Sequence, residues 1–112
     1  MNLNTNKTNN ICCVFFEKQH FEYRDVSGFF GKYKFCATIY DQKNNYGIDG
    51  DPVIALTVWR ISKTVKRISK TINYIRETET MKYNRGWIVN PQGKKESMAL
   101  SVILFCLKRL PR

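Results

Sequence analysis

A short apolar run near the middle of the chain, Pro52 to Trp59, is the segment around which we expect the fold to be organised. It reads Pro-Val-Ile-Ala-Leu-Thr-Val-Trp, and its β-branched residues favour a strand that is covered on both faces. Gly47, Gly50 and Asp51 precede it and supply turn-forming residues that fix where the strand begins. The alternative is a short buried helix, which the β-branched residues disfavour.

Alternating apolar and polar residues predict a β-hairpin before this strand. Its first strand begins near Phe21 and leads to Ser27-Gly28, and its second strand runs from Tyr33 to Tyr40. In the second strand we take one set of alternate residues as the core face: Tyr33, Phe35, Ala37 and Ile39. The preceding segment, Ile11 to Glu17, forms either an edge strand or a short packing segment.

The segment from Arg60 to Arg76 contains the sequence Arg-Ile-Ser-Lys-Thr twice, seven residues apart. Its apolar residues are spaced four, three, four and three apart, as in one stripe of an amphipathic helix: Ile61, Val65, Ile68, Ile72 and Ile75. The abundance of β-branched residues favours an elongated hairpin instead, because they lose side-chain freedom in a helix. We predict a helix on the periodicity, with its lysines and arginines on the side opposite the stripe.

Two further elements complete the predicted fold. Thr78 to Val89 is expected to form one strand with a bulge at Gly86, and Lys94 to Arg109 a largely buried apolar helix. The fold class is therefore α+β, with an antiparallel sheet of about four strands and the C-terminal helix packed on one face. The basic amphipathic helix is inserted before the last strand. Residues 11–112 form a single domain behind a disordered, Asn-rich tail of residues 1–10.

The formal net charge of +10 on 112 residues restricts the choice of partners. Such a charge attracts nucleic acid, anionic lipid or an acidic protein, although it can also serve solubility alone. Six basic residues and no acidic residue lie between positions 60 and 76. No apolar segment is long enough for a membrane-spanning helix or a signal peptide, so we expect a cytoplasmic protein.

The cysteines and the histidine offer little chemistry. Cys12, Cys13, Cys36 and Cys106 lack Cys-x-x-Cys spacing and His20 is the single histidine, so we predict no metal site and reduced, structural thiols. Nucleophilic catalysis would rest on His20 alone, and no glycine-rich phosphate-binding motif or esterase motif occurs. We therefore predict no catalytic residues, no cofactor and no enzymatic activity.

One polar constellation is a candidate for recognition or for structure: Asp41, Tyr46, Asp49, Arg85 and Trp87. If two strand ends meet, the guanidinium of Arg85 can form a bidentate ion pair with Asp49 beneath the indole of Trp87. The functional interpretation is a small recognition pocket. The structural interpretation, which we favour, is a buried ion pair that fixes the loop.

Two stretches of sequence together resemble a small family of uncharacterised bacterial and phage-borne domains. The first is Gly31-Lys-Tyr-Lys-Phe-Cys-Ala-Thr-Ile-Tyr-Asp followed by Tyr46-Gly-Ile-Asp-Gly, and the second is Tyr83-Asn-Arg-Gly-Trp followed by Pro91 and the C-terminal helix. The resemblance covers about Phe21 to Leu110. It departs from the family at Asn84, where the family has Asp, and in its longer segment 60–76, which indicates an insertion. The family has no established activity, so the resemblance implies an α+β fold and no catalytic residues.

We expect a small, basic, non-enzymatic binding module, an accessory protein of a mobile element that binds nucleic acid without sequence specificity. The predicted contacts are Lys63, Lys66, Arg67 and Lys70, with Tyr74 as the aromatic residue that would favour single strands. The alternative is a protein–protein interaction module or a small homo-oligomer, which binds itself or an acidic protein and whose charge serves solubility only. Binding of the basic segment to an anionic membrane surface is a third hypothesis.

Overall fold

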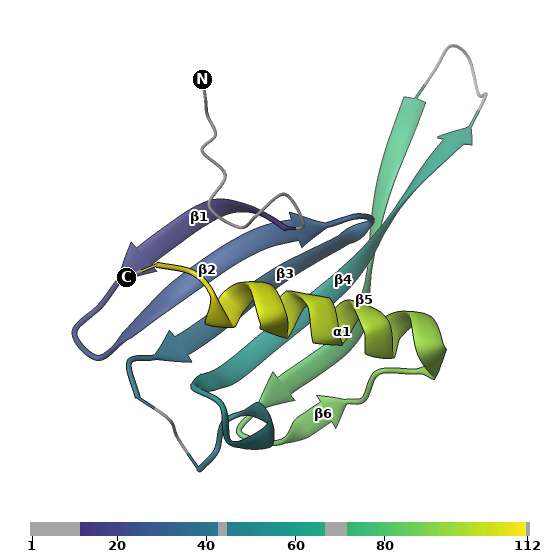
Figure 1. Cartoon of the computed structure of the whole chain (residues 1–112). Coiled ribbons are helices and arrows are strands. Elements are labelled where there is room, and N and C mark those ends of the chain that lie inside the picture. Colours follow the sequence, from purple (N-terminus) through teal and green to yellow (C-terminus); the bar gives the residue numbers. More distant parts are fainter. Residues whose placement is uncertain (1–11, 43–44, 67–71, 112) are drawn as a thin grey trace.

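The computed structural model describes residues 12–42, 45–66 and 72–111, with the backbone alone described at 63–66 and 72–75. These residues form six strands, a 3₁₀ turn and one α-helix (Figure 1): β1 (Cys13–Gln19), β2 (Tyr23–Phe30), β3 (Tyr33–Tyr40), η1 (Ile48–Gly50), β4 (Val53–Lys66), β5 (Ile72–Asn84), β6 (Trp87–Val89) and α1 (Gly93–Lys108). The strands make one antiparallel sheet in the order of the sequence.

Helix α1 lies across one face of this sheet, and the buried residues form a single cluster between the two layers (Figure 1). Strand β3 shows the two-residue period that the sequence predicts, because Phe35, Ala37 and Ile39 are buried beneath α1. Burying an apolar side chain of this size stabilises a fold by about 1.5–3 kcal/mol. The sheet therefore has a helix-covered face, which holds the core, and an opposite face, which we call the open face.

Strand β4 was expected to be covered on both faces, but the described elements cover only one of them. Leu56 and Val58 are buried on the helix-covered face, whereas Thr57 and Trp59 on the open face are half-buried. Part of the shielding on the open face comes from neighbouring side chains in the sheet, such as Lys34, whose Nζ lies 5.0 Å from the centre of the Trp59 ring.

The predicted basic helix at 60–76 was wrong, because β4 and β5 continue through this region as a hairpin. Their register pairs Ile61 with Glu77 and Lys66 with Ile72. Strand β3 pairs with β4 only as far as Arg60, so beyond this residue β4 and β5 leave the sheet as a two-stranded projection (Figure 1). We call the paired residues of this projection, 61–66 and 72–77, the arm. At about 3.3 Å per residue its paired part is about 20 Å long.

The hairpin is favoured over the helix because it continues an element that the core has already fixed. Residues 55–60 of β4 are held between β3 and β5, so each further residue extends an existing ladder of backbone hydrogen bonds. A helix would have to start anew, and nucleating a helix is unfavourable. The β-branched residues of this segment also lose less side-chain freedom in a strand than in a helix.

The predicted single strand from Thr78 to Val89 is divided into β5 and β6. The chain reverses at Arg85, which has a φ of 59°, and the backbone N–H of Asn84 donates a hydrogen bond to the carbonyl oxygen of Gly86 at 2.9 Å. Strand β6 then returns antiparallel to β5, with Trp87 opposite Tyr83. Gly86 therefore lies in a turn and not at a bulge.

The predicted fold class was therefore wrong in two respects. The sheet has six strands instead of about four, and α1 is the one α-helix among the described residues. The additional strands are β1, which the sequence left undecided, and β6. An α+β arrangement with a C-terminal helix on one face of an antiparallel sheet does describe the structure. Among the described helices, none is long and apolar enough to cross a membrane.

Buried thiols join the start of β1 to helix α1. Cys12 and Cys106 are each about 1% exposed, whereas the neighbouring Cys13 is exposed. Burial raises the pKa of the Cys12 thiol well above its ordinary range, and a side-chain hydrogen bond with Cys106 raises it further. The neutral thiol of Cys12 therefore acts as a small apolar group that holds β1 against the helix.

We expect a thiol-alkylating reagent at neutral pH to modify Cys13 first, then the half-buried Cys36, and to leave Cys12 and Cys106 intact in the folded protein. The reason is that the thiolate is the nucleophile, and burial suppresses both its formation and its access to the reagent. Peptide mass mapping over a time course measures the order, with complete modification in denaturant as the control. Rapid modification of Cys12 in the folded protein would show that β1 detaches from α1.

Candidate functional site

Three of the residues predicted to bind nucleic acid lie in the paired strands of the arm. Lys63 and Lys66 lie in β4, and Tyr74 lies in β5 in register with Thr64. Arg67 and Lys70 fall outside the described residues. A helix would place such cations on one side, whereas successive residues of a strand point to opposite faces. The one-sided basic surface that a helix would have presented is therefore replaced by a basic hairpin.

At the base of the arm, the charged side chains differ between the two faces of the sheet. On the open face, the Nζ of Lys34 donates to both carboxylate oxygens of Glu77, at 2.8 and 2.9 Å. On the helix-covered face, the register places Arg60 and Arg76, which are both exposed. Among the described residues, neither arginine forms an ion pair. The positive charge at the base of the arm is therefore concentrated on the helix-covered face.

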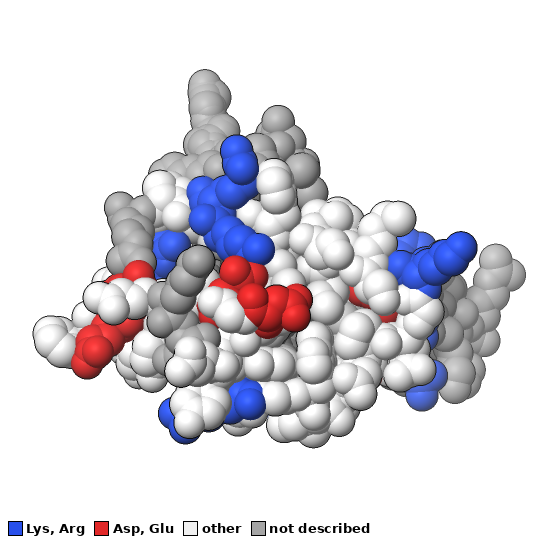
Figure 2. Space-filling model, turned by 60° about the horizontal axis from the view of Figure 1, so that its bottom comes forward, with Lys and Arg blue, Asp and Glu red and all other residues white. Residues whose placement is uncertain are grey.

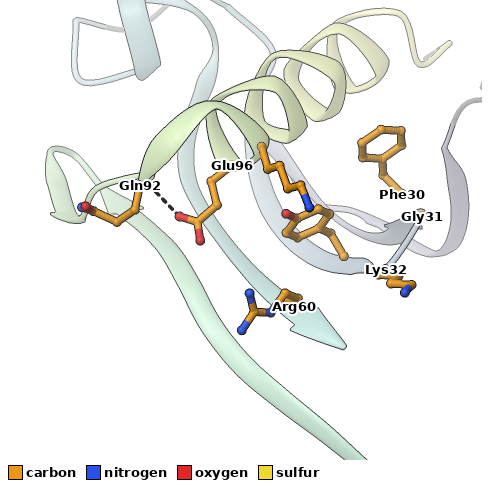
Figure 3. A pocket seen from close by; sticks show the side chains of 8 residues that line it. Phe30, Gly31, Lys32, Arg60, Gln92 and Glu96 are labelled. Atoms are coloured by element: carbon orange, nitrogen blue, oxygen red, sulfur yellow. Dashed lines mark hydrogen bonds between the residues drawn. The ribbon is translucent and has the colours of Figure 1, made fainter. Parts of the chain in front are cut away.

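A hollow of about 580 Å³ lies on this face, between Arg60 at the base of the arm, the β2–β3 turn and the first turn of α1 (Figure 3). We call it the helix-side hollow. Three of its lining residues are cations from three different elements: Lys32, Arg60 and Lys95. Figure 3 shows Gln92 and Glu96 on one side of the hollow and Phe30 and Gly31 on the other. Tyr33 completes the lining.

The one acidic residue of this hollow is already engaged by the backbone. The N–H of Gln92, the residue that caps α1, donates to Oε1 of Glu96 at 2.6 Å (Figure 3). This contact satisfies one of the free N–H groups at the start of the helix. Lys94 and Lys95 lie in the same first turn, where the helix dipole disfavours cations. The hollow therefore carries an excess of positive charge.

A second hollow of about 690 Å³ lies against the other side of the β2–β3 turn, and we call it the open-side hollow. It shares Gly31, Lys32 and Arg60 with the first hollow and adds Phe29, Ile61 and Ser62. Phe29 and Ile61 belong to the open face by their register. We define the arm root as the two hollows together with the β2–β3 turn between them.

Sequence reasoning did not identify the arm root. Lys32, Arg60 and Lys95 are distant in the chain and meet only because β4 passes beside the β2–β3 turn and α1 returns over the sheet. One local signal does exist in the sequence. Lys94 and Lys95 stand at the start of a predicted helix, where cations are unfavourable unless an anion is near.

The predicted polar cluster is assembled in part. Tyr83 donates its hydroxyl to the carbonyl oxygen of Tyr46 at 2.7 Å, and Trp87 packs edge-on against Tyr83 with ring centroids 5.1 Å apart. The guanidinium of Arg85 lies 5.4 Å from the centre of the Tyr46 ring. These contacts join the loop before β4 to the β5–β6 turn, which favours the structural interpretation of the cluster.

Two members of the cluster lie elsewhere. Asp49 is exposed within η1, and no ion pair joins it to Arg85 in the described part of the chain. Asp41 follows β3, where its backbone N–H donates to the carbonyl oxygen of Glu22 at 3.0 Å. The ion pair expected beneath the indole of Trp87 is thus replaced by a cation–π contact on Tyr46.

His20 takes part in a hydrogen-bonded network on the open face. Its Nε2 lies 3.0 Å from Oδ2 of Asp25, and Thr38 donates its hydroxyl to Oδ1 of the same carboxylate at 3.0 Å. A catalytic triad requires the imidazole between the nucleophile and the carboxylate, whereas here the carboxylate is in the middle. The network joins His20 and β2 to β3. No three His, Cys, Asp or Glu side chains gather as metal ligands within the residues that the structure describes.

The positive charge is not continuous over the body of the domain. Figure 2 shows separate groups of lysine and arginine on one face, and one of these groups lies directly against acidic residues. Ion pairs between described residues include Lys108 with Asp51 at 2.9 Å and the buried Arg24 with Glu17 at 2.6 Å. The body of the domain therefore neutralises part of its own charge.

Comparisons with curated proteins and with solved structures found no match. A family model described as Domain of unknown function (DUF7678) matches residues 24–108. This range extends from β2 to the end of α1 and lies within the span of the resemblance seen in the sequence. The chain therefore belongs to this family of domains of unknown function.

Proposed function

We propose that this chain is a non-enzymatic module that binds nucleic acid without sequence specificity, and that the arm makes the principal contact. The observation that carries this proposal is the charge of the arm and its base. Six basic residues and no acidic residue lie between Arg60 and Arg76. The described part of this segment projects from the sheet as two paired strands (Figure 1). In its biological setting we place the protein in the cytoplasm of bacteria or of phage-infected cells, as an accessory protein of a mobile element.

The shape of the arm suits a nucleic-acid groove. The major groove of B-DNA is about 12 Å wide and admits a two-stranded β-ribbon as well as an α-helix. A hairpin lacks the one-sided basic surface of the predicted helix, but it can still enter a groove of the nucleic acid. Lysines and arginines on such a ribbon neutralise phosphates and release counterions, which makes the affinity strongly dependent on salt.

We test this proposal by measuring the affinity for a short DNA duplex of arbitrary sequence over a series of salt concentrations. In the arm variant, Lys63, Lys66, Arg67 and Lys70 are all replaced by Gln. We expect the affinity at low salt to fall by about tenfold or more. The slope of log K against log salt should fall by about 1 for each phosphate that the variant no longer neutralises.

The matched control removes the same charge from the body of the domain, by replacing Lys18, Lys82, Lys108 and Arg109 with Gln. It should retain most of the wild-type affinity and slope. If both variants lose affinity equally, binding depends on net charge and not on the arm. If the wild-type protein does not bind at low salt, the proposed function is wrong.

A homo-oligomer is the second candidate, and strand β1 favours it. This strand lies at the edge of the sheet and exposes Phe15 and Phe16, by 54% and 47%. Exposed edge strands with apolar side chains are typical sites for pairing with another chain. Measuring the molar mass of the same samples by light scattering separates the two candidates. A stable dimer that does not bind DNA would support this second function.

A further inference from the structure

Two hollows lie back to back at the arm root, and their linings differ in chemistry. The helix-side hollow is lined by three cations, whereas the open-side hollow is lined by Phe29 and Ile61 together with two of those cations. We propose that the arm root binds one unpaired nucleotide of a single-stranded nucleic acid, with the phosphate in the helix-side hollow and the base in the open-side hollow. This inference rests on the proposed function and adds the class of nucleic acid.

The helix-side hollow has the composition of a phosphate site. Lys32, Arg60 and Lys95 are exposed and form no ion pair with any described residue. Glu96 accepts a backbone hydrogen bond through Oε1 and forms no ion pair with these cations. A phosphate group accepts several charge-assisted hydrogen bonds at once, and a guanidinium such as that of Arg60 can bind two of its oxygens. A phosphate would also offset the unfavourable lysines in the first turn of α1.

The open-side hollow has an aromatic wall suited to a base. Phe29 is 38% exposed and lines the hollow, and its ring is supported by Phe15, with ring centroids 5.0 Å apart. Ile61 supplies a second apolar wall. Unpaired bases stack on exposed aromatic side chains of many single-strand-binding proteins, whatever the identity of the base. A base within a duplex is already stacked and cannot enter such a hollow.

The β2–β3 turn lets one strand of nucleic acid reach both hollows. Gly31 lines each of them, and beyond its two neighbours in the chain no described atom lies within 4 Å of the position that a Cβ there would take. The turn is also fixed to the arm, since the backbone N–H of Ile61 donates to the carbonyl oxygen of Lys32 at 2.7 Å. The backbone of the nucleic acid can therefore cross above Gly31, between Lys32 and Arg60, without displacing a side chain.

The test compares a fluorescent oligothymidylate, which does not pair with itself, with a duplex of equal length. For Phe29→Ala we expect the affinity for oligothymidylate to fall by about tenfold, and the affinity for the duplex to stay unchanged, because only the unpaired base stacks on this ring. For Arg60→Gln we expect the slope of log K against log salt for oligothymidylate to fall by about 0.7, since the variant neutralises one phosphate fewer.

Phe21→Ala is the matched control, because Phe21 is 91% exposed and precedes β2 at the other end of that strand. It should bind both probes as the wild-type protein does. If Phe29→Ala binds oligothymidylate as tightly as the wild-type protein does, the nucleotide site is wrong and the proposed function still stands. If the wild-type protein binds neither oligothymidylate nor duplex, the nucleotide site and the proposed function are both wrong.

Competition identifies the source of the phosphate. Thymidine monophosphate or inorganic phosphate, added at concentrations comparable with that of the oligonucleotide, should not displace it, because the arm binds further phosphates along a strand. Displacement under these conditions would overturn the assignment to single-stranded nucleic acid and indicate a site for a free, phosphorylated small molecule.

Discussion

Phe35→Ala is expected to lower the free energy of unfolding by about 3–5 kcal/mol, as is typical for removing a fully buried aromatic ring. Phe35 is 0% exposed in β3, opposite Gly28 of β2 and Val58 of β4. Its ring occupies space that Gly28 leaves free, so truncation opens a cavity between the central strands and α1. Urea unfolding followed by tryptophan fluorescence measures the loss.

Phe29→Ala is the matched control, because it removes the same ring from the neighbouring strand on the opposite face. Phe29 is partly exposed, so we expect a loss of no more than about 1 kcal/mol. Equal losses for the two variants would mean that the open face is covered in solution. In that case the open-side hollow would not be available to a base, and an oligomer that buries this face would be the better explanation.

The contrast between these two phenylalanines also explains which parts of the fold the sequence could predict. Strand β3 was predicted correctly because the core and solvent impose a strict alternation on Phe35, Ala37 and Ile39. Helix α1 was predicted at nearly its observed bounds because a long apolar run, residues 98–107, follows the turn at Asn90 to Gly93. It is less buried than expected, since Met98 and Phe105 remain exposed. The local pattern of residues therefore predicts whether a segment is a strand or a helix more reliably than it predicts how far other elements bury that segment.

The arm is the region where local pattern is misleading. The isoleucines between positions 61 and 75 have a helical spacing, yet the described ones, Ile61, Ile72 and Ile75, lie in the paired strands β4 and β5. The spacing of side chains contains no information on the backbone partners that β4 already has in β3 and β5. The division of β5 from β6 was missed for a related reason, because the turn depends on the left-handed conformation of Arg85, and arginine has no preference for that conformation.

The arm root could not be derived from the sequence by local pattern at all. Its cations are single residues in a turn, a strand and a helix, and each has an ordinary solvent-exposed environment when considered alone. Only the sheet order and the path of α1 bring Lys32, Arg60 and Lys95 to one hollow. In contrast, the positive charge of segment 60–76 was evident from composition. The structure corrects the element that carries this charge, because β4 and β5 pair as strands where a helix was predicted.

Gly28→Ala is the second substitution for which we expect a large loss of stability, about 1–3 kcal/mol, from overpacking. A Cβ at this position would lie 2.6 Å from the carbonyl oxygen of Cys13, 2.7 Å from Cζ of Phe35 and 3.2 Å from Cα of Val14. Two of these atoms belong to the backbone of β1 and cannot rotate away. The methyl group therefore has to displace β1 or force the ring of Phe35 further into a closely packed core.

Gly86→Ala is the control for the conformational effect of replacing glycine, because a Cβ at Gly86 would meet no atom within 4 Å. Its free energy of unfolding should lie within about 0.5 kcal/mol of the wild-type value.

The double variant Gly28→Ala/Phe35→Leu separates the two clashes, since it relieves the clash with the ring and retains the clash with β1. If the destabilisation arises at β1, Gly28→Ala should detach this edge strand and expose Cys12 to alkylation in the folded protein. A Gly28→Ala variant that keeps wild-type stability and a protected Cys12 would contradict the close packing of β1 on β2, and with it the support that Phe15 gives to Phe29 at the arm root.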